Sequence, residues 1–328
     1  MAVNITDVLF PPSAFSSKTP FYFSAAPEYI PGISDHYLSI FAPIVIHWAV
    51  AGFFHALDCS EADWIVRHRI HESAEVKSRN RVSRLEVLRA VIFQQVVQMS
   101  LAYFWMDSAP HHVEPRAEMS ILAGRMYLAL GKLVGQGAAY AFMKAGGPDM
   151  VWAMYWWIIP VVQFFIAMFV VDTWQYFLHR AMHINKRLYR LFHSWHHRLY
   201  VPYAFGALYN HPVEGFLLDT LGSAVGEVLA GFSVRQATLF FIVATCKTLD
   251  DHCGYSFPWD PLQMLSGNTA DYHDIHHQML GIKSNFSQPF FVHWDVLLGT
   301  RMTREELIAR KAGHSAPSSK PTDAKKIE

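Results

Sequence analysis

The sequence carries little charge: only 16% of its 328 residues are Asp, Glu, Lys or Arg, whereas 52% are apolar and 15% are aromatic. This balance favours a membrane protein over a soluble globular domain of the same length. Basic and acidic residues are equal in number, so the formal net charge is zero and there is no basic field to attract nucleic acid. We therefore expect no nucleic-acid partner.

Cysteine is scarce as well. Three cysteines cannot build a disulfide framework, which favours chemistry that faces a reducing compartment. The first residues, MAVNITDVLFPPS, lack the basic start and apolar core of a signal peptide.

Two segments lack charged residues over the length of a membrane span: 37–57, with 21 residues, and 150–171, with 22. At about 1.5 Å per residue, each would cross a hydrocarbon core of about 30 Å. A shorter apolar segment, 90–106, contains three glutamines and is predicted to be a span that faces other helices. Pro160 predicts a kink in the third span rather than a break.

Two further segments leave alternatives open. Residues 216–246 contain Asp219, Glu227 and Arg235 between apolar stretches, which fits a re-entrant hairpin of two short helices or a single tilted span. Residues 119–142 are weakly apolar, and we interpret them as an interfacial or packed helix. The expected fold is all-α, a polytopic integral membrane protein with about four transmembrane helices or helical hairpins.

The distribution of Lys and Arg predicts the orientation. Residues 1–36 contain one such residue, whereas 58–89 contain seven. The positive-inside rule places the N-terminus outside the cytosol and residues 58–89 inside it. Two spans later the chain returns to the cytosol after residue 171, so the active site and the C-terminus are expected to be cytosolic.

The end of the chain is polar. We expect residues 301–328 to be a disordered cytosolic tail. Its last residues, KKIE, resemble the dilysine retrieval signal of endoplasmic reticulum membrane proteins, with Lys325 and Lys326 as the lysines. This resemblance implies a multi-pass protein of the endoplasmic reticulum membrane.

Histidine is concentrated after the third span. Ten of the 19 histidines fall between residues 179 and 277, in three clusters and two single positions. Spacings of three and four residues bring imidazoles to one side of a helix, where they can bind a common metal ion. Ten imidazoles exceed what one ion accepts, so two ions sharing them is the economical interpretation. The predicted ligands are His179, His183, His193, His196, His197, His211, His252, His273, His276 and His277.

Carboxylates near these histidines are candidates to orient the imidazoles by hydrogen bonding. The candidates are Asp172, Glu214, Asp251 and Asp274, although each also fits a helix cap or a surface charge. We interpret His47 and His55, in the first span, as ordinary hydrogen-bonded core residues. His293 has no partner at helical spacing and is left out of the predicted site.

The motifs HRAMH (179–183), HSWHH (193–197) and HDIHH (273–277) resemble the histidine pattern of the integral-membrane fatty acid hydroxylase superfamily. NHPVEG (210–215) and DHCGY (251–255) resemble its intervening motifs. The likeness covers about residues 150–300 and is greatest to the sphinganine C4-hydroxylases of fungi and plants. It implies an anchoring region with two spans at 1–149, a catalytic domain at 150–300 and the tail at 301–328.

The resemblance also implies a reaction. The expected enzyme is a non-haem di-iron monooxygenase that uses O2 to hydroxylate C4 of sphinganine or dihydroceramide, giving phytosphingosine or phytoceramide. No HPGG haem motif and no glycine-rich dinucleotide loop is present. The resemblance therefore implies that cytochrome b5 and NADH-cytochrome b5 reductase supply the electrons.

Two other functions fit the same motifs. A sterol desaturase or sterol methyl oxidase of the same superfamily would share the histidine pattern. A zinc-binding membrane protein, either transporter or structural, would also use imidazole ligands, and zinc can replace iron in purified protein. A transporter should carry its ionisable ligands midway through its spans. Here the clusters lie beyond the ends of the spans, which disfavours a transporter.

Overall fold

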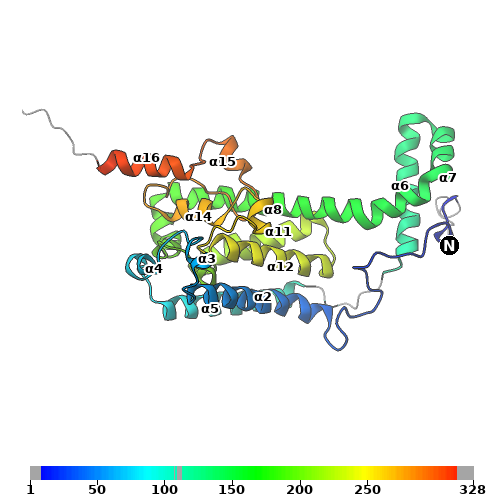
Figure 1. Ribbon diagram of the computed structural model, residues 1–328. Coiled ribbons are helices and arrows are strands. Elements are labelled where there is room, and N and C mark those ends of the chain that lie inside the picture. The colour runs from blue at the N-terminus through cyan, green and yellow to red at the C-terminus, as the bar shows by residue number, and fades with distance from the viewer. Residues whose placement is uncertain (1–8, 107, 109–112, 316–328) are drawn as a thin grey trace, which may run out of the picture. The chain divides into compact units, whose positions relative to one another are not determined.

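The computed structural model describes residues 9–106, 108 and 113–315 (Figure 1). Regular structure in this part of the chain is helical, and no β-strand lies in it, which confirms the predicted all-α class. The chain forms two compact units. The first comprises Met1–Phe41, Ala102–Met168 and Gly226–Phe240, and the second comprises Ala42–Leu101, Phe169–Val225 and Phe241–Glu328.

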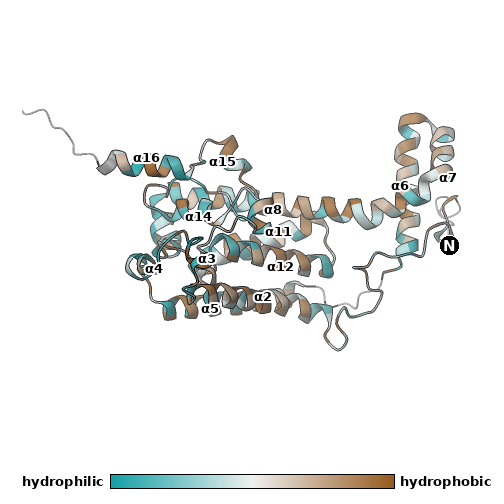
Figure 2. Ribbon diagram, in the orientation of Figure 1, coloured by the Kyte–Doolittle hydropathy of each residue, from teal (hydrophilic) through white to brown (hydrophobic). Residues whose placement is uncertain are grey.

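Three helical segments are long and apolar enough to cross a membrane: α2 (Asp35–Asp58), α5 (Arg84–Trp105) and the continuous stretch Gln136–Ile184. Only 17–22% of their most apolar windows is buried inside the protein, so these helices leave apolar side chains open to their surroundings. Figure 2 shows the apolar colouring along α2, α5 and α8. Such open apolar surface suits lipid contact and confirms a membrane protein.

The helical stretch that contains the third span extends beyond the apolar residues 150–171 at both ends. It contains α7 (Gln136–Ala153), a π-helical turn (Met154–Ile158) and α8 (Ile159–Ile184). Pro160 is the second residue after the π-helical turn. Since proline lacks an N–H and its ring crowds the preceding turn, the wider π turn accommodates it without ending the helix. The extension of α8 to Ile184 carries His179 and His183 on the same helix as the apolar segment.

Residues 119–142, predicted to be an interfacial or packed helix, are helical and packed, but they divide between two helices. The first unit contains α6 (Pro115–Val134), which ends at Gly135, and α7 begins directly after it. Gly135 has a φ of 86°, a conformation that favours glycine, and it reverses the chain so that α6 and α7 lie side by side (Figure 1). Met119 and Ala123 of α6 share a hydrophobic cluster with Met143 of α7.

Residues 216–246 form two helices, so the single tilted span is wrong. A π-helical turn (Phe216–Leu221) leads into α11 (Gly222–Ala230), and α12 (Val234–Asp251) follows. The break between the helices is at Gly231, whose φ of 65° also favours glycine. The predicted helical hairpin is therefore present.

The charged residues of this hairpin have partners within the protein, as a hairpin in a membrane requires. Asp219 accepts a hydrogen bond from Asn210 Nδ2 at 3.1 Å. Within the first unit, Glu227 accepts one from Trp105 Nε1 at 3.0 Å, and Arg235 Nε donates to Asp35 Oδ2 at 2.6 Å.

Part of the tail predicted to be disordered is a helix, α16 (Arg304–Ser315). Met302 and Leu307 are buried against Ile275, and Arg304 forms ion pairs with Asp271 and Asp274. The polar composition of this segment concealed these few apolar anchors. Lys325 and Lys326 lie outside the described residues.

Shorter helices complete the second unit and carry most of the polar chemistry. Two of them, α10 (Pro212–Gly215) and α14 (Ala270–His277), contain predicted site residues. The others are α3 (Asp63–Val66), α4 (Ser73–Arg79), α9 (Lys186–Leu188), α13 (Pro261–Leu265) and α15 (His293–Leu297).

Candidate metal centre

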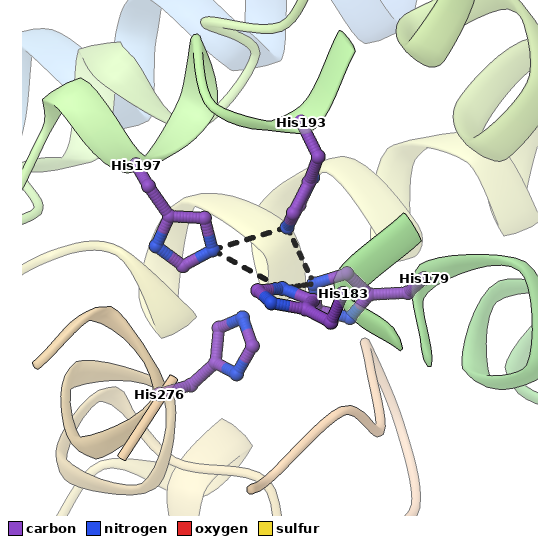
Figure 3. Close-up of side chains that lie close together, drawn as sticks. All are labelled: His179, His183, His193, His197 and His276. Atoms are coloured by element: carbon purple, nitrogen blue, oxygen red, sulfur yellow. Dashed lines mark hydrogen bonds between the residues drawn. The ribbon is translucent and has the colours of Figure 1, made fainter. Parts of the chain in front are cut away.

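Nine of the ten predicted histidine ligands gather into two sets in the interior of the second unit. In each set the nearest nitrogen atoms all lie within 4.8 Å of one another. Figure 3 shows the larger set, whose rings converge on one point from separate segments of the chain. The five-histidine set is His179, His183, His193, His197 and His276, and the four-histidine set is His196, His252, His273 and His277.

The two HxxHH motifs each contribute to both sets. On α14, His273 and His277 belong to the four-histidine set, whereas His276 belongs to the five-histidine set. Residues four apart lie on one face of a helix, and the residue at the third position lies about 100° away from the fourth. One helical turn therefore presents ligands in two directions, which a single ion would not use.

The HSWHH motif divides in the opposite sense. His193 and His197 belong to the five-histidine set, and His196 belongs to the four-histidine set. His193 ends a π-helical turn (Tyr189–His193), and His196 begins a short 3₁₀ turn (His196–Arg198). The pair His179 and His183 on α8 completes the five-histidine set, and His252, just after the end of α12, completes the four-histidine set.

Backbone carbonyls orient most of the rings. A carbonyl oxygen only accepts, so an imidazole that bonds to it must carry its proton on Nδ1 and leave an Nε2 lone pair. Five ligands are held in this way, with the Nδ1–oxygen distances in parentheses: His179 to Phe286 (2.8 Å), His196 to Tyr209 (3.2 Å), His252 to Thr248 (2.8 Å), His276 to Ser284 (2.7 Å) and His277 to Leu199 (2.7 Å).

These tautomers make the centre of each set a cluster of lone pairs. In the four-histidine set, Nε2 of His273 lies 3.1 Å from Nε2 of both His252 and His277. The last two have Nδ1 protonated, so both need a donor, and a single N–H on His273 serves only one of them well. A cation at the centre would satisfy all the nitrogens together. The donor set therefore fits a metal, and all-imidazole ligation suits iron, zinc or copper.

The five-histidine set has the same arrangement. Nε2 of His193 lies 3.0 Å from Nε2 of both His179 and His197 (Figure 3). His183 Nε2 lies 3.2 Å from the same atoms of His179 and His197. Nitrogens this close, with lone pairs facing one another, repel unless a positive charge lies between them.

Burial keeps these imidazoles in the form that binds metal. It lowers the pKa of His196 to about 3 and that of His252 to about 4. Burial, together with repulsion between neighbouring imidazoles, lowers the pKa of His193, His273 and His276 well below the usual range. Near neutral pH these rings are uncharged, which is the state required for ligation.

Glu214 is the carboxylate that contacts a predicted ligand directly. Its Oε1 lies 2.5 Å from Nδ1 of His193, and both side chains are buried. Glu214 lies on α10 in the NHPVEG motif, four residues after Asn210. A carboxylate on Nδ1 fixes the ring and raises the basicity of Nε2.

The other three predicted carboxylates contact different groups. Asp172 accepts hydrogen bonds from the backbone N–H groups of Phe290 (3.0 Å) and Phe291 (2.5 Å). Asp251 pairs with Lys247, and Asp274 bonds to His71 Nε2 at 2.8 Å and to Arg304. All three stabilise the segments that carry ligands instead of holding an imidazole of either set.

His211 lies outside both sets, contrary to its predicted role as a ligand. It precedes α10 and its Nδ1 accepts a hydrogen bond from the backbone N–H of Val213 at 3.2 Å. Its ring packs 5.0 Å from the rings of Phe192 and Trp195. The motif that contains it reaches the centre through Glu214 instead, which spacing alone did not distinguish.

Asp295 is not among the predicted carboxylates, yet it fixes a segment that orients one of the ligands. This buried carboxylate accepts hydrogen bonds from Phe286 N (3.0 Å), Ser287 N (2.7 Å), Tyr272 Oη (2.8 Å) and Thr300 Oγ1 (2.6 Å). It thereby fixes the segment whose Phe286 carbonyl orients His179. The available signal was a lone acidic residue in the apolar stretch FFVHWDVLL.

Replacing Glu214 with glutamine should weaken metal retention about 10–100-fold, because the neutral amide no longer raises the basicity of His193. The measurement is iron remaining on the purified protein against increasing chelator. The matched control is Glu61→Gln, since the Glu61 side chain is 80% exposed. Equal retention by both variants would show that Glu214 does not act on the metal.

Comparison with known proteins agrees with this geometry. Residues 164–300 match the family model described as fatty acid hydroxylase. The chain is 45% identical to the sphingolipid C4-hydroxylase of Schizosaccharomyces pombe, over 81% of this chain and 88% of that protein. It is 42% identical to sphinganine C4-monooxygenase 1 of Arabidopsis thaliana, over 82% and 89% of the two chains.

A third relative carries a different name. A very-long-chain aldehyde decarbonylase of Oryza sativa is 40% identical, over 86% of this chain and 94% of that protein. No solved structure matches the chain. The histidine motifs, the two sets that they form and the extent of these similarities lead to one assignment: the chain belongs to the fatty acid hydroxylase family.

Proposed function

We propose that this protein is a sphingolipid C4-monooxygenase that converts sphinganine or dihydroceramide into the 4-hydroxylated product, phytosphingosine or phytoceramide. The observation that carries the proposal is the pair of convergent histidine sets in a chain 45% identical to a sphingolipid C4-hydroxylase. An all-imidazole centre supports redox chemistry on an unactivated methylene, which acid, base or nucleophilic side chains do not achieve.

The metal is inferred to be iron, with one ion in each histidine set. The two directions in which each HxxHH motif presents its ligands support two ions, and imidazole ligation supports iron. Bound iron would supply the activation of O2, the co-substrate, that the reaction requires. The protein's own residues hold the ligands neutral, fix their tautomers through Nδ1 and exclude water by burial.

The position of the ligands on α8 suits a lipid substrate. His179 and His183 lie in the last two turns of a helix whose preceding residues are apolar and largely open. The alkyl chain of a sphingoid base can therefore remain among lipid tails while its polar head reaches the histidines. This arrangement supports delivery of substrate from the bilayer and not from water.

Electrons would come from cytochrome b5 and NADH-cytochrome b5 reductase. Lys186, Arg187 and Arg190 are exposed within a few residues of His183 and His193, where they suit an acidic donor protein. Arg198, which follows the HSWHH motif, is instead paired with Glu86 at 2.6 Å. Turnover in microsomes should stop when cytochrome b5 is removed, and undiminished turnover would exclude this route.

The location is proposed to be the endoplasmic reticulum membrane, with several spans and with the histidine sets and C-terminus in the cytosol. The excess of Lys and Arg in 58–89 and after the third span supports this orientation. An epitope added near the C-terminus should be accessible to antibody when only the plasma membrane is permeabilised. Accessibility only after the internal membranes are opened would reverse the topology.

The direct test of the function is mass spectrometry of sphingoid bases from cells with and without this protein. We expect the 4-hydroxylated base to disappear in its absence and to return on re-expression. Parallel assays with a long-chain aldehyde and a methylsterol address the activities that relatives and superfamily members carry. Consumption of either, without 4-hydroxylated base, would replace the proposed function.

A further inference from the structure

A small cavity of about 30 Å³ lies against both histidine sets. His193 of the five-histidine set lines it, together with His196, His252 and His273 of the four-histidine set. It has room for roughly two water-sized groups. A group held there would lie next to both metal positions.

Three carboxylates line this cavity, and two have basic partners. Glu214 lies 2.5 Å from His193 Nδ1, and Asp251 pairs with Lys247. The third, Asp219, has a single hydrogen bond, from Asn210 Nδ2 to Oδ2 at 3.1 Å, and no Lys, Arg or His within ion-pair distance in the described part of the chain. Among the three carboxylates of the cavity, Asp219 is thus the one without a Lys, Arg or His partner.

Two features of the local structure connect Asp219 with the metal centre. It lies in the π-helical turn Phe216–Leu221, and π-helical turns within helices occur frequently at functional sites. Its partner Asn210 also interacts with the imidazole of His196, so the carboxylate is linked to the metal centre through one side chain. Burial raises the pKa of Asp219 to about 7, which reflects the cost of a carboxylate without a cationic neighbour.

We propose that Asp219, oriented by Asn210, is the subsite that receives the ammonium group of a free sphingoid base. The inference rests on the proposed function. It narrows the substrate from sphinganine or dihydroceramide to sphinganine, the free base. An ammonium group supplies the charge that Asp219 lacks and forms a charge-assisted hydrogen bond in a water-poor cavity. The amide nitrogen of dihydroceramide is neutral and does not supply that charge.

The chemistry of the head group connects this subsite to the site of hydroxylation. Three bonds separate the nitrogen from C4, a span of less than roughly 4 Å. An ammonium group fixed at Asp219 therefore keeps the head-group carbons up to C4 beside the histidines that line the cavity, whereas carbons further along the chain can extend away from them. Asp219 is a specificity-determining residue in this view, since it limits which carbons are presented.

The experiment measures equilibrium binding to detergent-solubilised, iron-loaded protein by displacement of radiolabelled sphinganine. The competitors are sphinganine and octadecane-1,2,3-triol, in which a hydroxyl replaces the amine. Wild-type protein should bind sphinganine about 10–100-fold more tightly than the triol. Asp219→Asn should lose that preference while retaining iron and its affinity for the triol. Asp63→Asn, at an exposed position, should behave as wild type.

Three other binding results would overturn the inference. If the wild-type protein binds sphinganine and the triol equally tightly, the inference is wrong, and no variant is needed to show it. A parallel loss of affinity for both ligands in Asp219→Asn would indicate a structural role, and loss of iron would indicate a ligand. Amine-dependent binding that needs Asp219, without any 4-hydroxylated product, would refute the proposed function and leave the subsite intact.

Discussion

Replacing His276 with alanine should abolish C4 hydroxylation and lower the iron content below that of the wild-type protein. His276 is one of five nitrogens in its set, and its Nδ1 is already fixed by the Ser284 carbonyl at 2.7 Å. Loss of an outer partner of a ligand typically costs 10–100-fold in metal affinity or activity. Loss of the ligand itself should exceed that range. The measurements are 4-hydroxylated product by mass spectrometry and iron per chain.

The two sets allow a matched comparison. His196→Ala removes a ligand from the four-histidine set and should abolish activity equally, because the proposed chemistry needs both ions. His211→Ala changes an equally conspicuous histidine that lies outside both sets and should retain most activity. All three proteins should still insert into membranes. Normal product from His276→Ala would exclude the five-histidine set as the metal site.

Replacing Gly281 with alanine should disrupt the end of α14 and, with it, both histidine sets. A Cβ added at Gly281 would lie 1.9 Å from the Ile275 carbonyl oxygen, a backbone atom that no side-chain rotation can move away. That oxygen accepts a hydrogen bond from Gln278 N at 3.1 Å, so displacing it opens the turn that follows His276 and His277. Overpacking of this kind typically costs about 1–3 kcal/mol, occasionally more.

The measurement is the thermal stability and iron retention of the solubilised protein. Gly313→Ala provides the control, because nothing lies within 4 Å of a Cβ added there and alanine favours the α16 helix. We expect a lower midpoint and loss of iron for Gly281→Ala and no loss for Gly313→Ala. A fully stable, iron-loaded Gly281→Ala protein would show that the turn has room to move.

The helical class and the clustering of histidines could be predicted from sequence, because both depend on short-range spacing. Apolar length identified the three spans, and i, i+3 and i+4 spacing identified the imidazoles that share helical turns. The division of HSWHH and HDIHH between two sets could not be predicted, since it depends on how α8, α12 and α14 pack. The position of His211 outside both sets could not be predicted either, because a single histidine has no spacing to compare.

The positions of the chain reversals and of the short amphipathic helix at 304–315 could not be predicted either. Gly135 and Gly231 end helices through positive φ, yet glycine also occurs inside the long helices, at Gly52 for example. The polar composition of residues 304–315 predicts a disordered tail, although Leu307 within this segment is fully buried. Leu307 packs against Ile275, which is distant in sequence, so the local pattern does not contain the deciding contact.

The carbonyl groups that orient five of the nine imidazoles bear on how this site can change during evolution. A substitution at Ser284 or Phe286 replaces a side chain but leaves the oxygen that holds His276 or His179, provided that the backbone keeps its path. Selection on side-chain identity therefore has little direct effect on these backbone contacts. Selection should act instead on backbone shape, at positions such as Gly281, and on side chains that contact the imidazoles, such as Glu214. A lineage can thus alter much of the lining of this centre while its geometry persists.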